Sequence, residues 1–167
     1  MSTPNPSVTY ATYLKIDELL SLQQPRAEGP EHDELLFIVI HQVYELWFKE
    51  LLHELDRVAA LLRGDEPHRA QHTLKRILTI LKVMVAQLDI LEAMTPLEFL
   101  SFRARLEAAS GFQSNQFSQI EFLLGAENEG VLSRFPEGSA GRIALERRLL
   151  APTIWDAFLH YLAREKY

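Results

Sequence analysis

The chain has 167 residues, of which 47% are hydrophobic and 24% are charged. This balance is typical of a globular protein of one domain and excludes a disordered or a membrane chain. The formal net charge of -6 argues against a nucleic-acid partner, because phosphates are bound by clustered Lys and Arg. There are no cysteines, which excludes disulfides, iron–sulfur clusters and thiolate ligands to zinc or haem.

The sequence also carries expectations about cellular location. Residues 1–6 have neither the basic nor the apolar region of a secretory signal. The longest purely apolar run, residues 35–40, is far shorter than the ~18 residues that a membrane span needs. Together with the missing cysteines, these features predict a cytoplasmic protein with no membrane partner.

The first thirty residues predict a loose beginning and one short helix. We expect a flexible tail over residues 1–8, where Pro, Ser and Asn dominate. Apolar side chains at helical spacing then predict one amphipathic helix over residues 10–23. Two prolines and a glycine predict a linker over residues 24–30.

Two long helices follow. The first is predicted from about residue 32 to residue 63, because a Gly-then-Pro sequence over residues 64–67 ends the pattern. The second is predicted from about residue 68 to residue 94. Its expected core-facing stripe consists of Leu74, Ile77, Leu78, Leu81, Met84, Val85, Leu88 and Leu91.

The remaining elements are shorter. Thr95-Pro96-Leu97-Glu98 has the pattern of a capping box and predicts a helix reaching about residue 108. After a break at residues 110–114 we expect a helix to residue 124, a polar loop over 125–139, a weak helix over 140–150 and a last helix opening on a capping box at Thr153. No segment alternates with period 2, so we predict a single all-α domain over residues 1–167, a helical bundle with two long antiparallel helices.

His41 is the most informative side chain of the first long helix. It lies in the middle of an apolar stripe, four residues after Phe37 and three before Tyr44. One interpretation is a core histidine whose ring is hydrogen-bonded, and spacing alone favours it. The other is a histidine that faces a buried pocket, where its ring nitrogen binds a substrate or a metal-bound ligand.

Three other positions allow a structural and a functional interpretation. Glu50 and His53 have the Glu-x-x-His spacing of di-metal bundles, but no second motif exists and chance explains the pair better. Arg103 borders an apolar face and either extends to water or binds a substrate carboxylate. Gly111 either ends a helix or lets the backbone approach a flat ligand, and for both residues the structural interpretation leads on spacing alone.

A series of segments resembles a known family. In chain order they are YATYL at 10–14, HDELLFIVIHQ at 32–42, YELWFK at 44–49, LEAMTP at 91–96, Phe102-Arg103, and SGFQS at 110–114. The series resembles the tryptophan 2,3-dioxygenase family, most strongly from residue 10 to about residue 124. The fold implied by this resemblance is all-α and haem dioxygenase-like.

The resemblance implies a role for each matching position. His41 matches the catalytic histidine above the haem, and Arg103 matches the arginine that grips the substrate carboxylate. The residues matching walls of the indole pocket are Phe37, Phe99 and Leu106. Those matching the loop beside the haem edge are Ser110 and Gly111. An N-terminal segment that reaches into a neighbouring subunit's active site is matched by Tyr10, Tyr13, Leu14 and Ile16.

The implied activity is that of an oxidoreductase with haem b, L-tryptophan and dioxygen as its partners. Such an enzyme cleaves the indole C2–C3 bond to give N-formylkynurenine, in tryptophan catabolism by the kynurenine pathway. The family is homotetrameric, so the resemblance also implies a tetramer.

The resemblance assigns no haem ligand to this chain. In the family the proximal histidine belongs to the C-terminal half, which we expect to lie beyond Tyr167. The surroundings of His160 do not match the proximal motif, so the metal ligand is unassigned. A haem protein without an axial ligand binds haem poorly. The alternative is therefore a truncated, non-catalytic helical module of the same family, used for oligomerisation or ligand binding.

Overall fold

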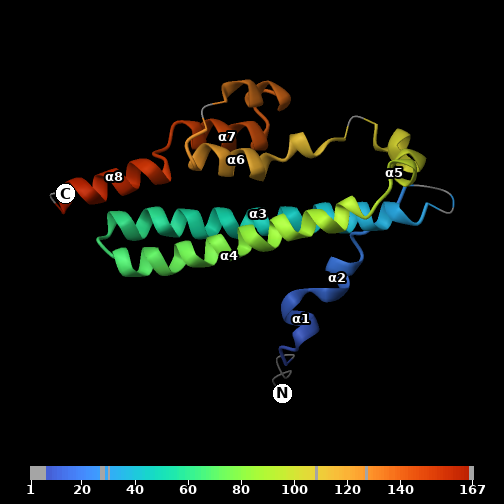
Figure 1. The fold of residues 1–167 in the computed structure, drawn as a ribbon, viewed down its shortest axis with the longest axis horizontal. Coiled ribbons are helices and arrows are strands. Elements are labelled where there is room, and N and C mark those ends of the chain that lie inside the picture. The colour runs from blue at the N-terminus through green and yellow to red at the C-terminus, as the bar shows by residue number, and fades with distance from the viewer. Residues whose placement is uncertain (1–6, 27–28, 30, 108, 127, 166–167) are drawn as a thin grey trace, which may run out of the picture.

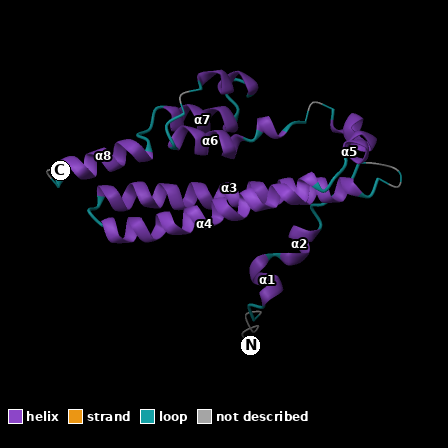
Figure 2. Ribbon diagram, viewed as in Figure 1, coloured by secondary structure: helices purple, strands orange, loops and turns teal. Residues whose placement is uncertain are grey.

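The computed structural model describes residues 7–26, 29, 31–107, 109–126 and 128–165 (Figure 1). These residues form eight α-helices and three short 3-10 helices, with no strand among them (Figure 2). The predicted all-α fold is confirmed. No helix in the described part of the chain is long and apolar enough to cross a membrane.

Helices α3, Asp33–Arg63, and α4, Pro67–Glu92, form the antiparallel pair that the sequence predicts (Figure 1). Asp33 and Glu34 lie in the first turn of α3, where the helix dipole favours negative charge. Gly64 follows the last residue of α3, and Pro67 opens α4. The Tyr44 hydroxyl donates a hydrogen bond of 2.6 Å from α3 to the Met84 carbonyl oxygen of α4.

The main core lies along α3, on Leu51, Leu55 and Val58. The stripe predicted for α4 is only partly right. The buried side chains of α4 are Ala70, Thr73, Ile77, Ile80 and Met84. Those that remain exposed are Leu74, Leu78, Leu81, Val85 and Leu88. Helix α4 carries two neighbouring apolar rows, and only one of them can face α3.

The N-terminal segment is two helices and not one. Helix α1, Tyr10–Leu14, is separated from α2, Ile16–Leu20, by Lys15, whose φ of 55° is left-handed. The prediction of a single helix over residues 10–23 is therefore wrong, because periodicity does not report a one-residue change of backbone handedness. We call residues 10–23, which contain α1 and α2, the N-terminal arm; its two helices project away from the α3–α4 pair (Figure 1).

Helix α5, Pro96–Arg103, starts at the predicted capping box. It ends earlier than the predicted residue 108, because the chain tightens into a 3-10 turn over Ala104–Leu106 and Glu107 then takes a left-handed φ of 50°. Helix α5 packs on the N-terminal part of α3 through Phe99 and Phe102.

Three more helices complete the described chain: α6, Asn115–Leu123, α7, Ala140–Leu149, and α8, Ile154–Arg164. Helices α6 and α8 pack against α3. A second, small core joins α6 to α7 through Phe122, Val131 and Leu145. The predicted loop over 125–139 contains a 3-10 helix, Glu129–Arg134, which places Val131 in that core.

Candidate functional site

An aromatic cluster joins the first turns of α3 to α5. The ring centroid of Phe37 lies 5.8 Å from that of Phe99 and 5.5 Å from that of Phe102. Phe99 and Phe102 meet edge to face at 5.5 Å, and Phe102 is completely buried. The capping box fixes where α5 begins, because the Thr95 amide donates to the Glu98 carboxylate at 2.6 Å. Hydrogen bonds from the Thr95 hydroxyl and amide lower the pKa of Glu98.

His41 lies one helical turn beyond Phe37, with the two rings 4.1 Å apart. Its Nδ1 atom is 2.7 Å from the Phe37 carbonyl oxygen, so Nδ1 carries the proton that it donates there. In the neutral ring Nε2 is then an acceptor, and it has no hydrogen-bond partner among the described residues. The ring is half-buried at the edge of the aromatic cluster. It does not lie in the core, although spacing alone favours a core position for this residue.

A groove of about 350 Å³ opens beside His41. The arm contributes Leu19 and Leu22 to its wall, and α6 contributes Gln116. The Gln116 side chain donates to both the carbonyl and the carboxylate oxygen of Glu45, at 2.9 and 2.8 Å. Sequence reasoning missed this groove, although the i, i+4, i+8 spacing of His41, Glu45 and Lys49 places the three on neighbouring positions of α3.

Arg103 ends α5 directly after the buried Phe102. Its side chain is exposed, and its Nη1 atom donates to the Glu107 carbonyl oxygen at 3.1 Å. It forms no ion pair with a carboxylate of the described residues, so its guanidinium keeps donors for an anionic group. Leu106 is half-buried in the 3-10 turn that follows.

Between α5 and α6, Gly111 opens a 3-10 helix, Gly111–Gln113, and Ser110 directly precedes it; both residues are exposed. The Ser110 amide donates to the Gln113 side chain at 3.2 Å. Nothing lies within 4 Å of the position that a side chain would take on Gly111. The surface beside Gly111 is therefore sterically open, although the carbonyl oxygens of Ser110 and Gly111 accept from the Gln113 and Ser114 amides.

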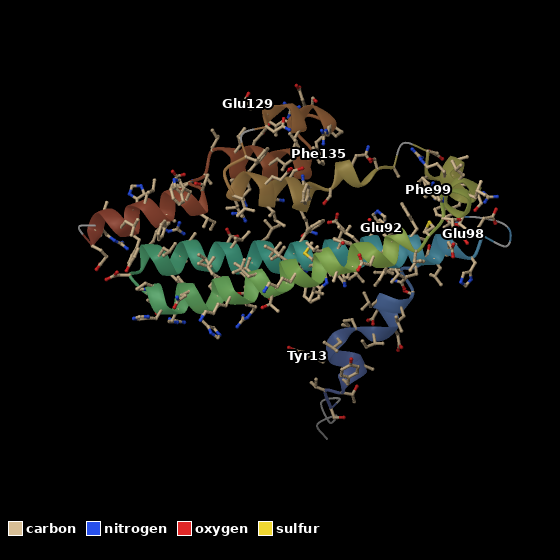
Figure 3. All side chains as sticks on the ribbon, viewed as in Figure 1. Tyr13, Glu92, Glu98, Phe99, Glu129 and Phe135 are labelled. Carbon is tan, nitrogen blue, oxygen red and sulfur yellow. The ribbon has the colours of Figure 1, made fainter. Side chains whose placement is uncertain are left out.

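The structure does not bring the arm residues to the aromatic cluster of the same chain. Tyr10 and Tyr13 are 77% and 75% exposed, Leu14 is exposed and Ile16 is half-buried. Figure 3 shows Tyr13 on the projecting arm and Phe99 well away from it on α5.

Within the described residues no three His, Asp or Glu side chains are grouped to hold a metal ion. Among these residues, Glu50 and His53 therefore have no third candidate ligand with which to hold a metal ion. His160 lies on α8, whose Arg164 donates to the carbonyl oxygens of Leu62 and Arg63. That end of α3 is about 33 Å along the helix from His41, at 1.5 Å per residue.

The described residues thus define an all-α protein built on a long helical pair, with a half-buried histidine at the edge of an aromatic cluster. Comparison with known proteins identifies the family. The profile of the tryptophan 2,3-dioxygenase family matches residues 2–136. The chain belongs to this family.

Individual relatives agree with the family match. A tryptophan 2,3-dioxygenase of Herpetosiphon aurantiacus is 58% identical over 161 residues, which are 96% of this chain and 62% of the relative. One of Anaeromyxobacter sp. is 51% identical over 99% of this chain and 62% of the relative. One of Nocardioides sp. is 52% identical over 93% of this chain and 60% of the relative. The chain thus spans about three fifths of the length of these curated relatives.

Proposed function

We propose that this chain carries the substrate-facing part of a haem-dependent dioxygenase that opens the indole ring of L-tryptophan with dioxygen. The bond broken is C2–C3, both oxygen atoms enter the product, and the product is N-formylkynurenine. The observation that carries the proposal is the His41 imidazole. Its Nδ1 is tied to the Phe37 carbonyl, and its Nε2 is left as an acceptor beside an aromatic cluster. Such an acceptor suits the indole N–H of the substrate.

The described residues fit one side of a haem. His41 offers an unpartnered ring nitrogen, and the open space beside Gly111 allows a flat group to approach closely. His160 lies on α8, near the end of α3 that is far from His41, so the residue that would ligate the haem iron stays unassigned. Haem b, when bound, supplies the activation of dioxygen.

The substrate is held by its two ends in this proposal. Phe37, Phe99 and Leu106 form apolar walls for the indole ring. Arg103, which is free of ion pairs with the described carboxylates, binds the substrate carboxylate in a charge-assisted pair. Holding both ends orients the ring toward His41 and excludes water from it.

We also propose that the enzyme is a cytoplasmic homotetramer. The exposure of Tyr10 and Tyr13 supports this, because large aromatic side chains on a projecting arm gain their burial from a second subunit. In a tetramer the arm, with Leu14 and Ile16, would complete the pocket of a neighbouring copy.

A second candidate is a non-catalytic module that oligomerises or binds a ligand without turnover. It is kept because no residue of this chain is assigned as a ligand to the haem iron. This candidate predicts association, with or without ligand binding, and no product.

A chimera separates the two candidates. The 161 matching residues of the Herpetosiphon aurantiacus enzyme are replaced by this chain, and the purified, haem-loaded chimera is given L-tryptophan in air. Formation of N-formylkynurenine, measured by mass spectrometry, is expected if the chain is a working part of a dioxygenase. A chimera that folds and loads haem without forming product would favour the non-catalytic module.

A further inference from the structure

A groove lined by basic side chains runs between α3 and α4, near the turn that joins them. His53 and Arg57 are one helical turn apart on α3, and His68, His72 and Arg76 are one turn apart from one another on α4. Glu54, Arg69 and Thr73 complete the lining, and the groove has a volume of about 360 Å³. Six of these eight side chains are basic, in a chain whose net charge is -6.

Only part of this positive charge is neutralised by the protein. Arg76 donates to the buried Glu54 carboxylate at 2.5 Å, and Arg69 pairs with Glu66. Arg57 and the three histidines have no hydrogen-bond or ion-pair partner among the described residues. The side chains without a partner thus come from both helices and line the same groove.

The start of α4 adds to the positive potential of the groove. Glu66 precedes the helix without a side-chain capping bond, and the first turn contains no acidic residue. It contains His68 and Arg69 instead, where the helix dipole disfavours positive charge. A bound anion would offset the unfavourable positions of His68 and Arg69, because it interacts favourably with both side chains and with the N-terminus of α4.

We propose that this groove binds a small oxyanion of the phosphate class. The Arg57 guanidinium would hold the oxyanion by charge-assisted hydrogen bonds, with His53, His68 and His72 donating from the two helices. The groove volume lies within the range of small-ligand sites. The site is separate from His41 and does not depend on the dioxygenase activity proposed above.

The acidic side chains near the groove oppose an anion. They are Glu54, Glu66 and the neighbouring Asp65, and two of them are already paired with Arg76 and Arg69. Arg57 is therefore the guanidinium of the groove that is left to bind the anion.

The test is calorimetric titration of the whole 167-residue chain with inorganic pyrophosphate, at about pH 7 and constant ionic strength. A single saturable site is expected. Arg57→Ala and His72→Ala should each weaken binding by about tenfold, because each removes one hydrogen bond to a charged ligand. The matched control is Lys75→Ala, which removes one positive charge of α4 outside the groove.

Three outcomes would overturn the proposal: absence of binding heat, equal affinity for pyrophosphate and chloride, or equal weakening by Arg57→Ala and Lys75→Ala. The circular dichroism of each variant shows whether it is folded. If Arg57→Ala unfolds the chain, the comparison of His72→Ala with Lys75→Ala answers the same question.

Discussion

The His41 imidazole is held in one tautomer by the helix that carries it. The Phe37 carbonyl accepts from Nδ1, and the Phe37 ring packs against the imidazole at 4.1 Å. One residue therefore fixes both the proton position and the ring orientation of His41. Sequence spacing put the two residues on one face, but it could not tell that the carbonyl and not a core side chain would satisfy the ring.

Arg103 allows a test that separates the two ends of the substrate. In the haem-loaded chimera, Arg103→Ala should weaken binding of L-tryptophan by about 10- to 150-fold, because a hydrogen bond to a charged group contributes ~1.5–3 kcal/mol. Tryptamine has the same indole ring and no carboxylate, so its binding should be unchanged. Calorimetric titration measures both ligands, and an equal loss for the two would rule out the carboxylate contact.

Leu51 and Leu78 form a matched pair for the core. Leu51 is 1% exposed on α3, whereas Leu78 is 57% exposed on α4. Leu51→Ala should lower the free energy of unfolding by about 3 kcal/mol, the usual cost of a cavity, and Leu78→Ala by less than about 0.5 kcal/mol. Urea unfolding measures both values. A similar loss for the two variants would contradict the observed choice of the buried face of α4.

At the scale of elements, the arm is fastened to α3 by two glutamines. Gln42 donates to the Leu22 carbonyl oxygen at 3.1 Å and accepts from the Gln23 side chain. Because Gln42 follows His41 directly, the same turn of α3 carries the proposed catalytic imidazole and the anchor of the arm.

Loss of this anchor should free the arm. In Gln42→Ala, tryptic cleavage after the exposed Lys15 should be about two- to tenfold faster, because each lost hydrogen bond contributes ~0.5–1.5 kcal/mol. Gln71→Ala, on the exposed surface of α4, is the matched control. Equal cleavage rates in the wild type and in Gln42→Ala would show that the arm is held by other contacts.

Helix α8 carries a capping box whose strength depends on pH. Hydrogen bonds from the Thr153 amide and hydroxyl lower the pKa of Asp156 from its ordinary value of 3.8. A lowered folded-state pKa means stability that is present above 3.8 and is lost as pH falls through the lower folded value.

Asp156→Asn should therefore lower the melting temperature at about pH 6, and the deficit should be smaller at about pH 3, where more of the Asp156 carboxylate is protonated. Asp89→Asn, on the exposed surface of α4, serves as the control. Thermal unfolding followed by circular dichroism gives the four values. A deficit of Asp156→Asn that is the same at both pH values would mean that the carboxylate charge is not what stabilises the cap.

Helix boundaries that depend on residues within one turn could be predicted from the sequence. Which face of a helix packs against its neighbour could not. The capping boxes at Thr95 and Thr153 fixed the starts of α5 and α8, because side chain and backbone there lie within one turn. The left-handed Lys15 carries no such signal. The buried face of α4 depends on how α3 approaches it, which is a tertiary property that periodicity does not contain.

At the scale of the whole molecule, much apolar surface of α4 is uncovered. Its exposed row of Leu74, Leu78, Leu81, Val85 and Leu88 recurs at spacings of three and four, as in a helix that packs on another helix. The tryptophan 2,3-dioxygenase relatives extend over about 1.6 times the matched length, since the match covers 62% of the first of them. In the proposed function, this chain supplies His41 and Arg103.

The most direct test of this account is the kinetics of two histidine variants in the chimera with the Herpetosiphon aurantiacus relative. His41→Ala should lower kcat/KM for L-tryptophan by roughly a hundredfold, because a positioned side chain that transfers or accepts a proton contributes about 10²–10⁴. His53→Ala, which removes an exposed imidazole three turns further along α3, should leave kcat/KM within about twofold of the unsubstituted chimera. Equal rates for His41→Ala and His53→Ala would contradict the assignment of His41 to the substrate.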